Sequence, residues 1–398
     1  MERDLPVEIL YDILTYAIHG SQECSNILCT NSIFHSIGLR ILHQDLVFTS
    51  VNQLMRFGKW IAGQDHNESR SLLCEPQTLT LDLAGRTASV LEVYPLGLRG
   101  VLDNNLSEPV QFTSLSIFQC LHRVLFHLVR HTSGVGTDAA GRLILETLYL
   151  RLNSHSSDSR CYAIEDAFML VNPRNFIWVG PDPPHHFSIA IVPNAVTPLF
   201  NALSTYTRLT NLKLTNIAFP APTFSDNQSV SLSLPSSSSS SESYISYFHL
   251  PIIPTLRTVH LGQATFLSAP TIASYILDTI TVRYDEPTSM TLRSPGLEDD
   301  RNMENSSPTR ASRYAELERI TLVDVYEGSI WGLRLRMPHI ITAALFLADR
   351  PEYRNVYEGR LGPGSASQDL KERIKDVVEA LVSVEVKTER IMGGDRGA

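Results

Sequence analysis

The feature that most constrains the fold of this chain is a short apolar frame that recurs through most of its length. In each copy, an apolar residue is followed three and five positions later by two more apolar residues. Alternating apolar positions of this kind are typical of short strands with one buried face. Clear copies begin at Leu145, Leu209, Leu256 and Leu317, a weaker copy begins at Phe112, and two more begin at Pro76 and Pro173.

The spacing of these copies indicates a single repeat array. Successive copies begin 36, 33, 28, 36, 47 and 61 residues apart. The two longest intervals contain low-complexity tracts of 19 and 28 residues, which are rich in serine at 225–243 and in acids, proline and serine at 285–312. Because such tracts cannot pack a core, we expect disordered insertions there. Without them every unit has 28 to 36 residues, which favours one interrupted solenoid over several domains.

Helical stripes lie between the predicted strands. Apolar residues step by three and four over 117–128 and over 196–203, and Pro270 begins a third stripe. Strand and helix units that bury their apolar faces only against neighbouring units are typical of a leucine-rich-repeat solenoid. The sequence therefore predicts an α/β fold in which residues 49–350 form an irregular solenoid of short parallel strands and helices. The alternative is an ordinary α/β domain whose buried strands begin with leucine.

The two ends of the chain have helical patterns of their own. At the C-terminal end, residues 351–398 are predicted to form a linker and an amphipathic helix over 368–384 that caps the array. Its inward residues are Ile374, Val377, Val378 and Leu381. At the N-terminal end, residues 1–48 predict three short helices, the first of which begins at Pro6, a favourable first helical position for proline.

The first of these helices has more apolar surface than a short helix needs. Its apolar residues form two neighbouring rows, Leu5, Ile9 and Ile13 in one row and Leu10, Leu14 and Ala17 in the other. Three short helices cannot bury a self-sufficient core. Their remaining apolar surface must therefore pack on the large domain, as a cap, or bind a partner.

The N-terminal segment resembles the F-box of mushroom-forming fungi. The resemblance rests on Leu5-Pro6-x-Glu8-Ile9-Leu10, then Cys29, Phe34 and Ile41-Leu42-His43. It implies contacts with the Skp-type adaptor of SCF-type cullin–RING ubiquitin ligases through Leu5, Pro6, Ile9, Leu10, Ile13, Cys29 and Phe34. The segment departs from the family at Gln22-Glu23-Cys24 and at Gly38. Glycine at position 38 replaces the more usual alanine and lowers helix stability by about 1 kcal/mol.

The same resemblance covers the large domain, because fungal F-box proteins commonly contain irregular leucine-rich repeats. The asparagine that ends the strand in regular repeats is present only at Asn153, and Ile217, Ala264 and Val325 stand at the equivalent positions. The implied function is that of a substrate-recognition adaptor in ubiquitin-dependent protein degradation, without chemistry of its own. A protein target is expected on the variable strand residues Tyr149, Arg151, Lys213, Thr215, His260, Gly262, Thr321 and Val323. These residues define no ligand class.

Composition limits the other function classes. A net charge of −9 argues against binding to nucleic acid, and no apolar run approaches the length of a membrane helix. The five cysteines form no CxxC pair, and no signal peptide is visible, so we expect a reducing compartment, the cytoplasm or the nucleus.

No sequence motif points to an enzyme, a cofactor or a metal site. The nucleophile-elbow, Walker A, His-Glu-x-x-His and dinucleotide-binding patterns are all lacking. We expect His185 and His186 in a surface loop, and Cys29 as a buried packing thiol and not a nucleophile. Trp178, Trp331 and Tyr326 suit either a binding face or the core. Two other function classes stay open, a repeat scaffold that binds no ligase and an enzyme on an unrecognised α/β fold.

Overall fold

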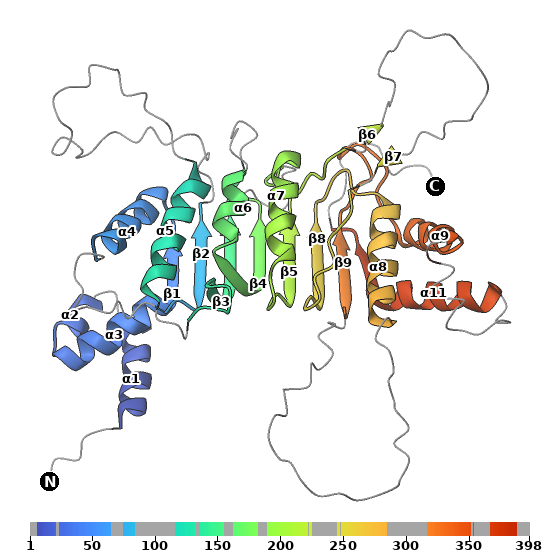
Figure 1. The fold of residues 1–398 in the computed structure, drawn as a ribbon. Helices are drawn as coiled ribbons and strands as arrows, with labels where there is room; N and C mark the ends of the chain where they lie inside the picture. The colour runs from blue at the N-terminus through green and yellow to red at the C-terminus, as the bar shows by residue number, and fades with distance from the viewer. Residues whose placement is uncertain are drawn as a thin grey trace, which may run out of the picture. The chain divides into compact units, whose positions relative to one another are not determined.

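The chain forms an α/β structure around one eight-stranded parallel sheet with the strand order β1-β2-β3-β4-β5-β8-β9-β10 (Figure 1). This computed structural model describes residues 6–20, 24–64, 75–83, 116–132, 136–154, 162–181, 189–221, 223–224, 245–246, 248–284, 317–351, 353 and 367–387. The predicted insertions at 225–243 and 285–312 lie outside these residues. The chain divides into two compact units, residues 1–220 with 260–265 and residues 221–259 with 266–398.

The first unit begins with helices and continues as alternating strands and helices. Its elements are α1 (Val7–Gly20), α2 (Cys24–Leu28), α3 (Ser32–Gln44), β1 (Asp45–Phe48), α4 (Val51–Gln64), β2 (Thr78–Asp82), α5 (Ile117–His131), β3 (Leu143–Arg151), α6 (Tyr162–Phe168), β4 (Val171–Val179), α7 (Pro193–Ser204) and β5 (Asn211–Thr215). The later elements are β6 (Thr223–Phe224), β7 (Ile245–Ser246), β8 (Thr258–Gly262), α8 (Ala269–Tyr284), β9 (Arg319–Val323), α9 (Met337–Ala348), α11 (Ser367–Leu381) and β10 (Val382–Glu385). Of these, β6 and β7 form a separate antiparallel pair.

The recurring apolar frame forms the buried side of the strands, as predicted. Equivalent frame residues pair in register across β2, β3, β4 and β5, namely Leu79, Leu148, Phe176 and Leu212, and then Leu81, Leu150, Trp178 and Leu214. Each of these side chains is buried, and the frame residues of β8 and β9 are buried in the same way. The periodic spacing in the sequence thus corresponds to ladders of apolar side chains that run across the sheet.

The weak copy of the frame overlaps the helical stripe predicted over 117–128, and the structure confirms that helix. Ile117, the last residue of the weak copy, opens helix α5, and β2 pairs directly with β3. A capping box begins this helix, because the Ser116 hydroxyl accepts from the Gln119 N–H while the Gln119 side chain accepts from the Ser116 N–H. Phe112 lies outside the described residues.

Two strands were not predicted. Strand β1 follows α3 without a break and pairs in parallel with β2. Strand β10 pairs with β9, so the predicted helix over 368–384 ends at Leu381, and its last three residues belong to a strand. Alternating Val382 and Val384 favour a strand over a continued helix. The inward positions Ile374 and Val378 are buried, as expected for the helix that precedes it.

In the first unit, helices α5, α6 and α7 lie on one side of the strands (Figure 1). Trp178 on β4 is at the centre of this interface, with ring centroids 5.5 Å from Phe118 of α5 and 5.9 Å from Phe168 of α6. Its indole N–H donates to the Leu152 carbonyl at 3.0 Å. The alternate residues of the same strands are half-exposed or exposed, so the sheet has one core face and one open face.

Candidate functional site

The first three helices form a small module, residues 6–20 and 24–44, which we call the N-terminal module. Its core has only three buried apolar side chains, Leu14, Ile18 and Ile41. Half-buried residues surround them, namely Leu10, Tyr11, Cys24, Ile27, Leu28, Phe34 and Ile37. Asn31 caps α3 by accepting from the Phe34 N–H at 2.7 Å.

Gly38 has a packing role in this module. A Cβ atom at position 38 would overlap the Leu28 side chain and would lie 3.2 Å from Ile18 Cδ1. The departure from the usual alanine therefore permits the close approach of α3 to the two preceding helices, at the cost in helix propensity that was expected from the sequence.

The predicted adaptor-contact residues do not share one surface. Leu10 and Phe34 pack against the core of the N-terminal module, whereas Pro6, Ile9, Ile13 and Cys29 are exposed. Leu5 lies outside the described residues. The expectation that Cys29 is a buried packing thiol is wrong, because it follows the last residue of the short helix α2 and is exposed.

The exposed residues of α1 include an apolar row that sequence analysis found only in part. Ile9, Ile13 and Tyr16 follow one another at helical spacing and are 47%, 51% and 85% exposed. We call these three residues the α1 row. Tyr16 was missed, although its position three residues after Ile13 continues the stripe. Ile33 on α3 is also exposed and was not predicted.

The N-terminal module is fixed to the sheet through the last turn of α3. The Tyr11 hydroxyl donates to Gln44 Oε1 at 2.8 Å, and the Gln77 N–H, just before β2, donates to the Gln44 carbonyl at 2.8 Å. Where β1 begins, the Thr78 hydroxyl donates to Asp45 Oδ1 at 2.6 Å. The chain thus passes from the helices into the sheet through hydrogen bonds that set the orientation of the module.

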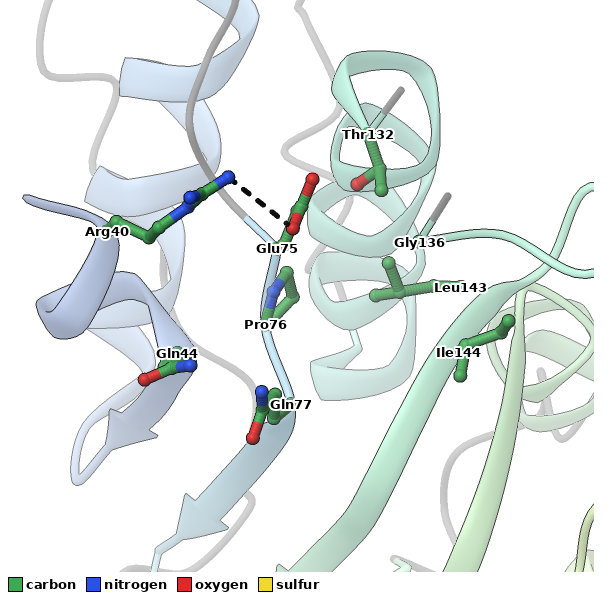
Figure 2. A pocket seen from close by; sticks show the side chains of 9 residues that line it. All are labelled: Arg40, Gln44, Glu75, Pro76, Gln77, Thr132, Gly136, Leu143 and Ile144. Atoms are coloured by element: carbon green, nitrogen blue, oxygen red, sulfur yellow. Dashed lines mark ion pairs between the residues drawn. The ribbon is translucent and has the colours of Figure 1, made fainter. Parts of the chain in front are cut away.

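A cavity of about 170 Å³ lies along this connection (Figure 2). Its lining residues are Arg40, Gln44, Glu75, Pro76, Gln77, Thr132, Gly136, Leu143 and Ile144. The ionisable side chains among them, Arg40 and Glu75, face each other at 3.9 Å and are about half exposed. The lining provides amide, hydroxyl and apolar groups but no pairing of a nucleophile with a base. We interpret the cavity as the space left where the N-terminal module packs against the sheet.

The open face of the sheet has ordered rows of side chains. Thr78, Thr147, Asn175 and Asn211 stand in register across β2 to β5, and the Asn211 amide donates to Asn175 Oδ1 at 2.6 Å. The neighbouring row consists of Val47, Thr80, Tyr149, Ile177 and Lys213. An ion pair of 3.6 Å joins Asp82 to Arg151 at the next position.

This face includes several of the variable strand residues that were predicted to meet a target. Tyr149, Arg151, Lys213 and Thr215 are half-exposed or exposed on β3 and β5. Gly262 and Val323 are buried, so they do not fit that prediction. Parallel sheets are usually covered on both faces, and an accessible face with apolar and polar rows is therefore a candidate binding surface.

The other candidates from the sequence are divided between core and surface. Trp178 and Tyr326 are fully buried, whereas Trp331 is 67% exposed. His185 and His186 lie outside the described residues. Within the described ranges, no three His, Cys, Asp or Glu side chains gather as a metal site would require. No helix among these ranges has the length and apolar character needed to cross a bilayer.

Comparison with protein-family models, with curated proteins and with solved structures finds no match for this chain.

Proposed function

We propose that this protein is the substrate-recognition adaptor of an SCF-type cullin–RING ubiquitin ligase. The N-terminal module binds the Skp-type adaptor, and the leucine-rich-repeat-like domain binds a protein target. The observation on which the proposal depends most is the α1 row, three large apolar side chains exposed along one face of a helix whose other face is buried. Such a subunit acts in the cytoplasm or the nucleus.

The α1 row has the character of an interface centre. Aromatic residues are enriched among the side chains that dominate binding energies, and Tyr16 is flanked on the same helix face by two isoleucines. The acidic residues Glu8 and Asp12 are exposed on the same helix and provide a polar border. The remaining predicted contacts Pro6 and Cys29 are exposed as well, so a partner that covers α1 has further surface within reach.

The attachment of the N-terminal module suits the mechanism of such a ligase. A recognition subunit acts by proximity, because it holds the lysines of its target at high effective concentration near the charged ubiquitin-conjugating enzyme. This requires a fixed geometry between the two binding surfaces. The hydrogen bonds of Gln44 to Tyr11 and to Gln77 supply that rigidity between the module and the start of the sheet.

The open face of the sheet is the surface we assign to the target. Its side chains combine an amide and hydroxyl row with a row that contains Tyr149 and Ile177. Both rows are set by strand register and not by loops, so their spacing is fixed before a partner binds.

Calorimetric titration of the full chain with purified Skp-type adaptor tests the proposal. We expect tight binding by the wild type and a loss of affinity of about tenfold or more in Ile9→Ala/Ile13→Ala/Tyr16→Ala, as removal of interface-centre residues usually gives. Trp331→Ala/Leu333→Ala/Phe346→Ala is the matched control, because it removes three similarly exposed apolar side chains elsewhere. Equal loss in both variants would contradict the proposal.

A repeat scaffold that binds no ligase is the second candidate. It is favoured by the open face, which needs no ligase to bind a protein. A folded wild type that fails to bind the adaptor would support the scaffold and exclude the ligase function.

A further inference from the structure

Helices α4 and α5 differ in charge from the rest of the chain. The whole sequence has 42 acidic residues against 33 lysines and arginines. Yet α4 and α5 together contain no acidic residue, and their charged side chains are Arg56, Lys59, Arg123 and Arg130. All four are exposed. Helix α5 adds three histidines to this positive segment.

The two helices are neighbours, so these charges belong to one region of the surface. Helix α4 packs against α5 (Figure 1), and a Cβ atom placed on Gly58 would lie 3.0 Å from Val124 Cγ2. Leu54, Ile61 and Val124 are buried beneath them. The exposed sides of the two helices therefore form adjoining strips, which we call the basic face.

Within the part of the chain that the structure describes, Arg56, Lys59 and Arg123 of the basic face form no ion pair. Some exposed basic side chains elsewhere pair with acids, as in Arg174 with Glu146 at 3.5 Å and Arg257 with Glu318 at 3.3 Å. Among the described residues, no carboxylate lies within ion-pair distance of Arg56, Lys59 or Arg123. The basic face is thus a concentrated positive region on an otherwise acidic protein.

Two exposed aromatic side chains lie among the charged side chains of the basic face. Trp60 and Phe126 are 42% and 43% exposed. The Arg130 guanidinium carbon lies 5.8 Å from the centroid of the Phe126 ring, and the His122 ring is stacked against the same phenylalanine at 6.3 Å. These contacts hold Arg130 in place and add apolar area beside the charges.

We propose that the basic face binds an acidic segment of a partner protein, in which Asp and Glu alternate with apolar residues. The carboxylates would meet the exposed cations, and the apolar side chains would cover Trp60 and Phe126. Nucleic acid fits less well, because the net charge of −9 repels a long polyanion. The proposal does not depend on the ligase function.

Fluorescence anisotropy of the full chain with a labelled peptide of alternating glutamate and leucine tests this inference. At low salt we expect saturable binding that weakens as NaCl is added, and no binding of a matched peptide with glutamine in place of glutamate. Arg56→Gln/Lys59→Gln/Arg123→Gln/Arg130→Gln should weaken binding about tenfold, since exposed charge contacts are individually modest.

The control variant removes four exposed cations outside the basic face, Arg208→Gln/Arg257→Gln/Lys371→Gln/Lys375→Gln. It has the same net charge as the first variant and should retain most of the peptide binding, because the cations of the basic face stay in place. Equal loss in both variants, or no binding by the wild type, would overturn the inference. Binding of labelled oligouridylate in preference to the peptide would also overturn it and would identify a nucleic-acid surface.

Discussion

The N-terminal module and the β3–β4 segment differ in how completely they bury their apolar residues. Around β4, Trp178, Phe176, Phe118 and Phe168 are all buried and in contact through their rings. The N-terminal module buries only Leu14, Ile18 and Ile41, and it leaves the α1 row exposed. The repeat segment buries its large apolar side chains without a partner, whereas the N-terminal module leaves apolar surface exposed. This contrast is the physical basis of the proposed adaptor function.

The largest effect should come from the repeat core. Trp178→Ala would remove a fully buried indole and leave the Leu152 carbonyl without its donor, so we expect the free energy of unfolding to fall by about 3–5 kcal/mol. Urea unfolding followed by circular dichroism measures it. Trp331→Ala removes an exposed tryptophan and should change stability by less than about 0.5 kcal/mol. Similar losses in both variants would mean that the repeat core is not organised around Trp178.

A smaller and more local effect is expected in the N-terminal module. Leu14→Ala should destabilise the module by about 2–3 kcal/mol, at the lower end of the usual cost because its half-buried neighbours can relax into the space. Hydrogen exchange should then increase in α1 and α3 but not in β3 and β4. Ile13→Ala, one position away and half-exposed, should leave exchange unchanged. Faster exchange throughout the sheet would show that the two regions unfold together.

The smallest expected effect concerns the junction between α3 and α4. His43 has its ring 5.5 Å from Trp60 and 6.2 Å from Phe57, and burial lowers its pKa below the ordinary value of 6.5. The unfolded chain therefore binds a proton more readily than the folded chain. Stability should be complete above pH 6.5 and should fall as the pH drops from there toward the lowered pKa.

Thermal unfolding between pH 5 and 7 measures this dependence, and His43→Gln should reduce its slope. His35→Gln is the control, because His35 is exposed on the same helix. An unchanged slope in His43→Gln would assign the pH dependence to another group.

The sequence predicted the strand ladders because burial imposes the same spacing on every repeat. Leu148, Phe176 and Leu212 could be placed in register from the frame alone. Ile117 fitted both the frame and a helical stripe, and a capping box begins a helix there. The frame could not find β1 or β10, which lack its first apolar residue. A periodic pattern describes what is buried, but it does not exclude a helix that buries the same residues.

In the turn after β5, an asparagine lies one position before the place where the sequence pattern was searched for it, so its role was not predicted. The expected asparagine position holds Ile217, but the preceding Asn216 has a φ of 60° and donates to Gln263 Oε1 at 2.6 Å. Gln263 also has a positive φ, of 48°. Both side chains belong to the first unit, where they link two successive strand ends. One amide hydrogen bond therefore joins these two strand ends, one position before the asparagine that the resemblance implies.

The candidate site was predictable in part. Sequence periodicity predicted two neighbouring apolar rows on α1 but not which of them faces outward. Leu10 and Leu14 turned out to face the core, and Ile9 and Ile13 the solvent. That choice depends on where α3 packs, and α3 approaches the side chains of Leu28 and Ile18 closely at Gly38. The positive charge of α4 and α5 was visible in the sequence, but only their packing showed that the charges adjoin.

The most direct test of the adaptor function is hydrogen exchange of the full chain with and without the purified Skp-type adaptor. The α1 row predicts slower exchange in α1 and α3 on binding, and unchanged exchange in β3, β4 and β5, whose open face is left for the target. Protection confined to the strands, or no protection anywhere at saturating adaptor, would contradict the assignment of the N-terminal module as the ligase-binding surface.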